Sequence, residues 1–280
     1  MKGVKWSKKN TKNVKAVITC GGIGTRLMPF TKEMPKEMAP IFWKEENILC
    51  VKPLIEIIYE KLYEMGIREF CFINGKTKRV IENHFSPQDT TLNSDNTFDE
   101  KLKTSRIFWI TQNEPKGFGD AVKYASTFAT NEEIIVQAGD VAVISEPNPI
   151  KRLIELGRNS DFDAILLIRK VSEPKRHGIV TLEENKDLSR VIKVQEKPEK
   201  PETDLGIMPM YFFKPVIFSA LEKTKPGKNN EVQLTDAIQI LIESGKKVMA
   251  LRVDNHEFYD VGTPESYWKA LQDSHKHFER

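Results

Sequence analysis

The sequence predicts an α/β fold whose sheet is mostly parallel or mixed and is flanked by helices. Short apolar runs typical of strands alternate with segments of helical spacing through the first half of the chain. The run at 16–20 is dominated by apolar residues, as expected of a strand that is buried on both faces. At 280 residues the chain is also long enough to bury a full core.

The first half predicts four strands, each followed by a helix. Gly66 supplies a stop for the first helix, and Asn148 and Gly157 are cap signals at the two ends of the fourth. The polar residues 86–104 are expected to form a surface loop. The expected elements are strands at 16–20, 69–73, 106–110 and 133–138, and helices at 54–65, 77–85, 117–128 and 149–157.

The second half has more strand-like runs with fewer helices between them, which suits a mixed extension of the same sheet that carries a substrate pocket. Thr263 and Pro264 open a last helix, with one face formed by Trp268, Leu271, His275 and Phe278. The other expected elements are strands at 163–170, 178–182, 190–195, 206–213 and 247–253, and helices at about 214–222 and 233–244.

Composition excludes several classes of protein. No apolar run approaches the roughly 20 residues of a membrane span, so we expect no membrane association. The first 15 residues lack the apolar core of a signal peptide. The three cysteines, Cys20, Cys50 and Cys71, lack metal-ligand spacing, and Cys20 and Cys71 sit in apolar runs. We therefore expect buried thiols and a cytoplasmic location.

The formal net charge of +3 comes from the start of the chain. Residues 1–15 contain six lysines and no acidic residue, so the remaining chain has 37 basic and 40 acidic residues and a charge of −3. We expect residues 1–14 to be a basic, mobile tail. The folded body has no charge bias toward a polyanion, which favours a small-molecule partner over a nucleic acid.

A glycine-rich turn after the first strand is the leading candidate for a ligand site. Gly21, Gly22 and Gly24 have no Cβ, so their backbone N–H groups can crowd against an anionic ligand such as a phosphate chain. Arg26 and Lys36 add two positive charges nearby. Together these features predict a polyphosphate site, with a glycine turn that binds nothing as the alternative.

Two familiar phosphate-binding motifs do not fit this turn. A Walker-type loop ends in Gly-Lys-Ser/Thr, but Gly24 is followed by Thr25 and Arg26. A dinucleotide fingerprint aligned on Gly22 and Gly24 needs a small residue at the position of Leu27.

The whole run G-G-x-G-T-R-L-x-P-x-T-K-x-x-P-K at 21–36 resembles the signature of the sugar-1-phosphate nucleotidyltransferases. The Pro-Lys-Glu-Met ending at 35–38 is most similar to the UTP–glucose-1-phosphate uridylyltransferases of the bacterial type, and the resemblance covers roughly 14–275. It implies a Rossmann-like single domain over 15–280. Within this domain it implies a nucleotide-binding part at about 15–145, a sugar-binding part at about 146–262 and a C-terminal helix at 263–280.

Gln112 and Gly117 form a second candidate site. A glutamine amide can both donate to and accept from the imide edge of uracil or thymine. In the family that the chain resembles, the matching glutamine and glycine bind the pyrimidine. The alternative is a solvent-exposed loop glutamine beside a glycine that starts a helix.

Asp140 and Asp260 are candidate metal ligands. Each follows an apolar run, and open α/β sheets place ligand chemistry at the carboxyl ends of their strands. Two carboxylates beside phosphates suit Mg²⁺, which prefers oxygen ligands. Each aspartate alone is more often a cap or a turn residue, but both match metal-binding aspartates of the resembled family.

Gly178, Glu196 and Lys197 are candidates for the sugar side. Glu196 can accept hydrogen bonds from sugar hydroxyl groups, and Lys197 can hold the sugar's phosphate as a point charge. The alternative is that Gly178 is only a hairpin glycine and that Glu196 and Lys197 are a solvated ion pair. The chain departs from the family at His177, where a tyrosine is frequent, and at 206–209, which contains a proline.

The segment 231–236 also matches the uridylyltransferase pattern. We expect Thr235 and Asp236 to cap a helix start, with Glu231 as a pocket residue.

The resemblance implies transfer of a nucleotidyl group to a sugar 1-phosphate, first of all glucose 1-phosphate, from UTP or alternatively dTTP. Gly21, Gly22, Gly24 and Thr25 would bind the triphosphate, with Arg26 on the pyrophosphate and Lys36 at the α-phosphate. It also implies a homo-oligomer.

Two rival functions remain. A glycosyltransferase of related architecture would show an Asp-x-Asp motif, which the run Gly139-Asp140-Val141-Ala142 does not contain. A non-catalytic nucleotide-sugar regulator would be expected to lack Arg26, Lys36 or one of the aspartates.

Overall fold

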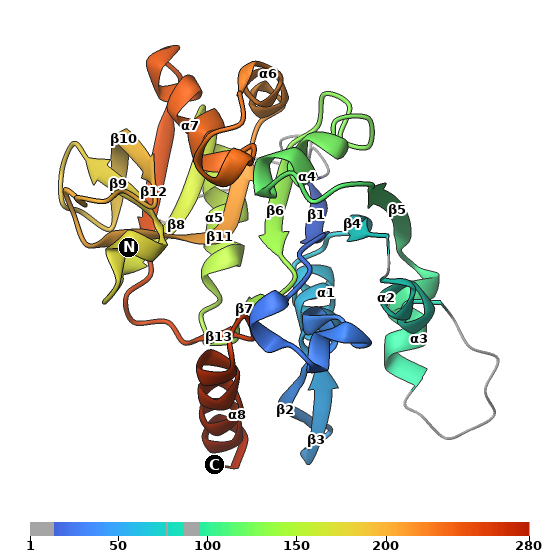
Figure 1. Cartoon of the computed structure of the whole chain (residues 1–280). Coiled ribbons are helices and arrows are strands. Elements are labelled where there is room, and N and C mark those ends of the chain that lie inside the picture. Colours follow the sequence, from blue (N-terminus) through green and yellow to red (C-terminus); the bar gives the residue numbers. More distant parts are fainter. Residues whose placement is uncertain (1–13, 77, 87–95, 280) are drawn as a thin grey trace, which may run out of the picture.

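The computed structural model of the chain describes residues 14–76, 78–86 and 96–279. The expected basic tail falls almost entirely on residues outside these ranges. The centre of the fold is a nine-stranded sheet with the strand order β5-β4-β1-β6-β11-β8-β12-β10-β9 (Figure 1). Its strands are β1 (Lys15–Cys20), β4 (Glu69–Gly75), β5 (Arg106–Gln112), β6 (Ile134–Ala138), β8 (Ala164–Lys170), β9 (Gly178–Leu182), β10 (Leu188–Glu196), β11 (Leu205–Phe213) and β12 (Val248–Arg252).

The sheet is parallel in its first half and mixed in its second. β1 pairs in parallel with β4 and with β6, so that Val17 lies opposite Cys71 on one side and Val136 on the other. β11 runs antiparallel to both β6 and β8, whereas β12 is parallel to β8. β10 and β9 complete the far edge in antiparallel pairs. The predicted α/β fold with a mixed extension is therefore confirmed.

Helices cover both faces of the sheet and close two apolar cores. Because successive strand residues point to opposite faces, Ala16 and Ile18 of β1 contribute to one core and Val17 to the other. One face carries α1 (Leu54–Glu64), α2 (Arg79–His84), α3 (Asn96–Lys103) and α5 (Pro149–Asn159), and the other carries α4 (Phe118–Tyr124), α6 (Val216–Lys223) and α7 (Leu234–Glu243).

A hairpin that the sequence did not predict lies below the sheet in Figure 1, formed by β2 (Pro40–Glu45) and β3 (Ile48–Pro53). The last helix, α8 (Pro264–Glu279), packs beside it: Phe42 N donates to Ser274 Oγ at 3.2 Å, and the Tyr267 hydroxyl donates to Pro40 O at 3.0 Å. The expected apolar face of this helix is wrong at Trp268, which is 62% exposed.

Two further expectations need correction. Of the expected loop 86–104, residues 87–95 lie outside the described ranges and residues 96–103 form α3; Leu102 is buried, and the Phe98 ring packs edge-on against Tyr59. Gly157 does not end α5, which continues to Asn159. A methyl group on Gly157 would lie 2.4 Å from the Phe212 ring, so the glycine serves close packing of helix on sheet.

Two other expectations hold. Asn148 caps α5 as predicted, since its Oδ1 accepts from Ile150 N at 2.9 Å. Cys20 and Cys71 are buried free thiols, and burial raises the pKa of each.

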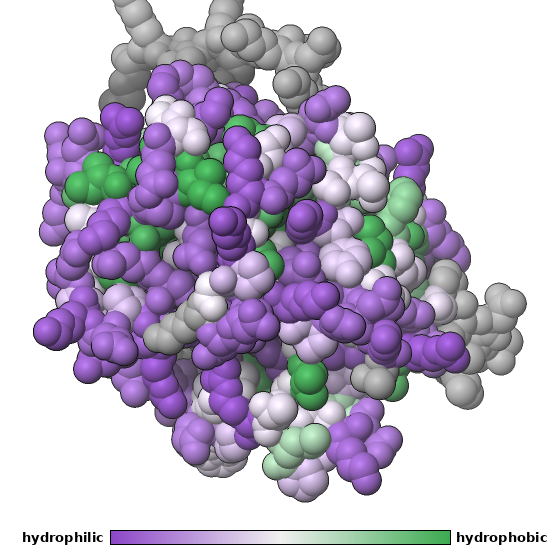
Figure 2. Space-filling model, turned by 45° about the horizontal axis from the view of Figure 1, so that its top comes forward, coloured by the Kyte–Doolittle hydropathy of each residue, from purple (hydrophilic) through white to green (hydrophobic). Residues whose placement is uncertain are grey.

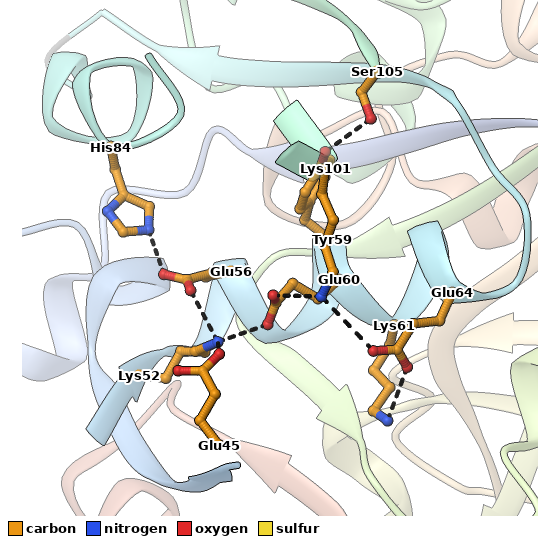
Figure 3. Close-up of polar contacts among 10 residues, drawn as sticks. All are labelled: Glu45, Lys52, Glu56, Tyr59, Glu60, Lys61, Glu64, His84, Lys101 and Ser105. Atoms are coloured by element: carbon orange, nitrogen blue, oxygen red, sulfur yellow. Dashed lines mark hydrogen bonds and ion pairs between the residues drawn. The ribbon is translucent and has the colours of Figure 1, made fainter. Parts of the chain in front are cut away.

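An ion-pair cluster along α1, called here the α1 cluster, joins the hairpin to α1, α2 and α3 (Figure 3). Lys52 Nζ lies 3.1 Å from Glu56 Oε1 and 2.8 Å from Glu60 Oε2. Its members are Glu45, Lys52, Glu56, Glu60, His84 and Lys101. Lys52, Glu56 and Glu60 are buried and the other three members are partly exposed; the members are mutually paired, so the cluster ties four elements together.

The outer surface is polar for the most part. Figure 2 shows a face on which hydrophilic residues dominate and hydrophobic ones gather in small areas. Among the residues that the structure describes, no helix combines the length and the apolar character that crossing a membrane requires.

Candidate active site

The glycine turn follows β1 and runs into a short 3-10 helix, η1 (Thr25–Leu27). Gly24 is the N-cap of η1, and its φ of 74° lies in the left-handed region that favours glycine. A methyl group on Gly24 would lie 2.9 Å from Thr31 Cγ2, and Thr31 Oγ1 donates to Gly24 O at 2.7 Å. Thr25 and Arg26 lie exposed on η1. The turn is therefore held from behind while its outer side stays accessible.

Lys36 comes from a second 3-10 helix, η3 (Lys36–Met38), and meets the turn and an aspartate. Its Nζ lies 2.5 Å from Asp140 Oδ2, and a methyl group on Gly22 would lie 3.4 Å from the same Nζ. Burial alone would lower the pKa of Lys36, but the charges of Asp140 and Glu37 and the hydrogen bond to Asp140 outweigh it, so the pKa is raised. Lys36 thus remains a cation at the floor of the site.

Asp140 and Asp260 lie 120 positions apart in the sequence but side by side in the fold. Two three-residue strands, β7 (Val141–Val143) and β13 (Phe258–Asp260), pair antiparallel, and Val261 N donates to Asp140 O at 3.1 Å. A methyl group on Gly262 would lie 2.9 Å from Asp260 Oδ1 and 4.0 Å from Asp140 Oδ2. The small β7–β13 sheet is what brings the two carboxylates together.

The two aspartates fit a hard divalent cation. Burial and the charge of Asp140 raise the pKa of Asp260, which shows that two carboxylates repel each other here. Among the described residues no three His, Cys, Asp or Glu side chains form a metal site by themselves. The donor set is therefore two carboxylates, to be completed by phosphate oxygens and water, which is a common way of binding Mg²⁺.

Gln112 closes another side of the glycine turn. It ends β5 and is only 4% exposed, and its Nε2 donates to Asp120 Oδ2 at 2.7 Å. A methyl group on Gly21 would lie 2.4 Å from Gln112 Oε1. Gly117 is the N-cap of α4 and has a φ of 108°. Val232 O lies so close to its Cα that a side chain would not fit there. Asp120 thus holds the amide so that its acceptor oxygen faces the turn.

The three candidate sugar residues also come together. Gly178 begins β9 and lies opposite Glu196, the last residue of β10. Glu196 Oε1 pairs with Lys197 Nζ at 3.0 Å, and its Oε2 accepts from Thr235 Oγ1 at 2.6 Å. A methyl group on Gly178 would lie 3.2 Å from Glu196 Oε2. Lys197 has a φ of 41°, an uncommon conformation for a lysine. His177, by contrast, is half-buried, with Nδ1 3.1 Å from Glu173 O.

Residues 231–235 join the base side to the sugar side. Gly119 N donates to Val232 O at 2.9 Å, and Val232 N donates to Lys116 O at 2.7 Å. Glu231, which belongs to the same segment as Val232, lies beside Gly117. The expectation that Thr235 and Asp236 cap α7 is wrong: the N-cap is Gln233, whose side chain donates to Glu231 Oε2 at 2.9 Å and does not cap the helix, and Thr235 bonds Glu196 instead.

The site roles of four residues escaped the sequence reasoning: those of Glu37, Lys78 and Asp120, and that of Thr235, which was expected only to cap a helix. Asp120 and Thr235 each fix a predicted residue through one hydrogen bond. Glu37 Oε1 and Oε2 each accept from Lys78 Nζ at 2.7 Å behind Lys36. The only sequence signal was the position of Glu37 directly after Lys36 within the motif. The partners of these residues lie 8 to 41 positions away, so no local pattern reveals them.

Known proteins are similar to the chain along nearly its whole length. A family profile described as "Nucleotidyl transferase" matches residues 15–277. The UTP–glucose-1-phosphate uridylyltransferase 2 of Streptococcus pyogenes serotype M3 is 36% identical over 280 residues, which cover 94% of this chain and 90% of that protein. The UTP–glucose-1-phosphate uridylyltransferase of Staphylococcus haemolyticus is 36% identical over 262 residues, covering 89% and 87%.

Solved structures agree with these matches. A UDP-glucose pyrophosphorylase complexed with UDP-glucose superposes with a TM-score of 0.83 at 29% identity, covering 95% of this chain and 99% of that one. A UTP-bound enzyme of the same name from Acinetobacter baumannii gives a TM-score of 0.79 at 27% identity, covering 96% and 94%.

Proposed function

The chain belongs to the nucleotidyl transferase family, and we propose that it transfers the uridylyl group of UTP to glucose 1-phosphate, giving UDP-glucose and pyrophosphate. The resemblance seen in the sequence is thereby confirmed. The observation that carries the proposal is the convergence of the glycine turn, Lys36, Asp140 and Asp260 at one place. The names of the relatives and the UDP-glucose and UTP bound in similar structures support the choice of substrates.

The reaction needs no covalent enzyme intermediate. A phosphate oxygen of glucose 1-phosphate is already an anion, and it attacks the α-phosphorus of UTP in line. The bond between the α-phosphorus and the bridging oxygen breaks, and pyrophosphate leaves with the electron pair. Catalysis therefore rests on positioning and on neutralising charge.

Each residue of the nucleotide part has a task in this scheme. The backbone of Gly21, Gly22, Gly24 and Thr25 lines the triphosphate. Arg26, exposed on η1, pairs with the departing pyrophosphate. Lys36 faces the α-phosphate, where charge builds during transfer.

The base and the sugar are held on two further sides. Gln112 Oε1 accepts from N3–H of uracil, with Gly117 leaving room for the backbone to complete that edge. Gly178 lets the sugar approach the backbone, Glu196 accepts from its hydroxyl groups and Lys197 holds its phosphate. In this proposal the nucleotide-binding part covers about 15–145 and the sugar-binding part about 146–262.

Asp140 and Asp260 would hold the divalent metal, which we take to be Mg²⁺. When bound, the metal would offset the negative charge that two phosphate groups bring into one site. Lys36 does the same from the protein side, because its ammonium stays charged beside Asp140. The homo-oligomer and the cytoplasmic location stay predictions.

Pyrophosphate release tests the proposal when it is measured over a panel of nucleotides and sugar 1-phosphates. UTP with glucose 1-phosphate should be the best pair. A clear preference for dTTP would make the protein a thymidylyltransferase. Binding of UDP-glucose without any release would indicate a regulator. A purine nucleotide as best substrate would contradict both the assignment of Gln112 and the proposed reaction.

A further inference from the structure

A buried ion pair lies directly behind the proposed catalytic lysine. Glu37 is 1% exposed and Lys78 is 6% exposed, and both carboxylate oxygens of Glu37 accept from Lys78 Nζ at 2.7 Å. Glu37 follows Lys36 on η3, whereas Lys78 is the N-cap of α2, in the connection that follows β4. The pair therefore connects two elements that are distant in sequence, immediately beside Lys36.

The pair also supports the turn that carries Asp140. A methyl group on Gly139 would lie 3.1 Å from Glu37 Cγ, 3.0 Å from Cys20 Sγ and 3.2 Å from Thr19 O. Gly139 N donates to Thr19 O at 3.0 Å, which fixes the turn to the end of β1. Glu37 thus fills the space between the end of β1 and the residue before Asp140, with no room for a side chain at Gly139.

Stability alone gives no reason for a charged pair at this place. Moving two charges out of water costs about as much as their attraction returns, and apolar residues of similar volume often stabilise as well or better. Local structure does not hold Lys36 either, because η3 is a three-residue 3-10 helix with no side-chain cap. Both carboxylate oxygens of Glu37 accept from the one Lys78 ammonium, so the pair links η3 to the start of α2 at a defined point, which apolar packing specifies less sharply.

We propose that Glu37 and Lys78 are positioning residues, which hold η3 against the Gly139 turn so that Lys36 Nζ faces the reacting α-phosphate in one fixed arrangement. The inference rests on the proposed function. Neither residue touches substrate in this arrangement, since both side chains are closed off behind the site. Their effect on the reaction passes through Lys36.

The central experiment replaces the pair by Glu37→Met and Lys78→Met together in the full-length chain. The thermal unfolding midpoint should stay close to that of the unmodified protein, because neither charge is left buried alone. The kcat for pyrophosphate release should fall between about tenfold and a hundredfold, since a small displacement of a catalytic group has that effect. The KM for UTP should change far less than kcat.

A mutant cycle separates positioning from a general loss of structure. In a Lys36→Ala background, the two methionines should lower kcat by no more than about twofold, because the pair acts through Lys36. The matched control is Lys15→Met with Glu69→Met, a partly buried pair with Nζ and Oε2 at 3.1 Å at the opposite end of β1. It should alter stability but leave kcat within about twofold.

A further variant and a structure make the test independent of folding and of the proposed reaction. Glu37→Asp keeps both charges but withdraws the carboxylate from Lys78, so it should also lower kcat. This variant provides the test if the double methionine variant fails to fold. A crystal structure of the folded variant should show Lys36 Nζ moved out of contact with Asp140 Oδ2. That displacement with no turnover in the unmodified chain would refute the proposed function alone. An unmoved Lys36, an unchanged kcat in either variant, or a full additional loss in the Lys36→Ala background would overturn the positioning role.

Discussion

Lys36 is a cation by virtue of its neighbours, and this decides what it can do in the reaction. Its raised pKa keeps it protonated near neutral pH, so it cannot serve there as a general base. It can, however, face charge that builds on the α-phosphate. An interaction that strengthens in the transition state affects turnover more than ground-state binding.

Lys36→Ala should therefore lower kcat by about a hundredfold or more, as removal of one electrostatic donor does in other enzymes. The KM for glucose 1-phosphate should change much less. Steady-state kinetics of pyrophosphate release measure both constants. A raised KM with an unchanged kcat would show that Lys36 only binds substrate.

Asp120 offers a second prediction at this scale, which concerns the base. It accepts from Gln112 Nε2 and so fixes Gln112 Oε1 as the acceptor that faces the glycine turn. In Asp120→Asn the amide can turn over and present Nε2, which suits N3 of cytosine rather than N3–H of uracil. The ratio of kcat/KM for UTP to that for CTP should then fall by about tenfold or more, because a reversed polar contact is strongly discriminating.

The control for this change is Lys123→Gln, an exposed position on the same helix, which should leave the ratio unaltered. If the ratio of kcat/KM for UTP to that for CTP were the same in Asp120→Asn as in the unmodified protein, Asp120 would not set the orientation of Gln112.

At the level of residues, the sequence indicated the candidate site residues that stand in motifs. It missed the residues that fix those side chains through hydrogen bonds. Lys36, Asp140 and Gln112 stand in recognisable runs. Glu37, Asp120 and Thr235 matter because of one side-chain contact each with a distant partner. Such contacts depend on how elements pack, which a local pattern does not contain.

The shortest strands that the structure describes are the ones that bring together the two carboxylates proposed to hold the metal. β7 and β13 have three residues each, too few for any hydrophobic period to show in the sequence. The hairpin of β2 and β3 escaped prediction as well, and α3 was hidden in a polar stretch from which Phe98 and Leu102 pack against the core. Longer elements with clear periods, such as α1 and β8, were predicted close to their observed bounds.

The β7–β13 pairing leads to a prediction about the metal. Pyrophosphate release should stop with EDTA and return with Mg²⁺. Asp140→Asn and Asp260→Asn should each be severely impaired, and the double variant should be little worse than the worse single one, because both act through one ion. Titration of activity with Mg²⁺ makes this comparison.

Each variant needs a check that it is folded, for which circular dichroism and a thermal unfolding curve suffice. Gly262→Ala is a useful companion, since a methyl group there would lie 2.9 Å from Asp260 Oδ1 and should weaken the apparent affinity for Mg²⁺ without removing a ligand. Full activity of either asparagine variant at limiting Mg²⁺ would remove that aspartate from the site.

Over the whole molecule, the sequence predicted the sheet and its covering helices better than the side-chain contacts that join these elements. Alternating strands and helices set the parallel half of the sheet, and denser strand runs indicated its mixed half. Besides the apolar core, the α1 cluster (Figure 3) joins the hairpin, α1, α2 and α3, and its members come from four separate segments. Its charges read as ordinary surface residues in the sequence, because nothing local shows that Lys52 and Glu60 are buried.

The α1 cluster should make the stability of the protein depend on acid through Glu56. Burial would raise the pKa of Glu56, but the hydrogen bond with His84 and the charge of Lys52 outweigh it, so the folded-state pKa lies below the ordinary value of 4.5. A carboxyl group whose pKa is lowered on folding stabilises the folded state fully above its unfolded-state pKa. That contribution is lost as the pH falls through the folded-state value.

Glu56→Gln should therefore lower the free energy of unfolding by about 2 kcal/mol near neutral pH, a typical value for hydrogen bonds to a charged group. The difference from the unmodified protein should stay constant down to a pH near 4.5 and then shrink as Glu56 itself becomes protonated. Urea unfolding at a series of pH values gives the curve.

Glu64→Gln, which alters a side chain that is 50% exposed on the same helix, is the control and should change stability little at any pH. A Glu56→Gln difference of the same size in acid as at neutral pH would show that the carboxylate charge contributes nothing, and that the variant acts through packing alone.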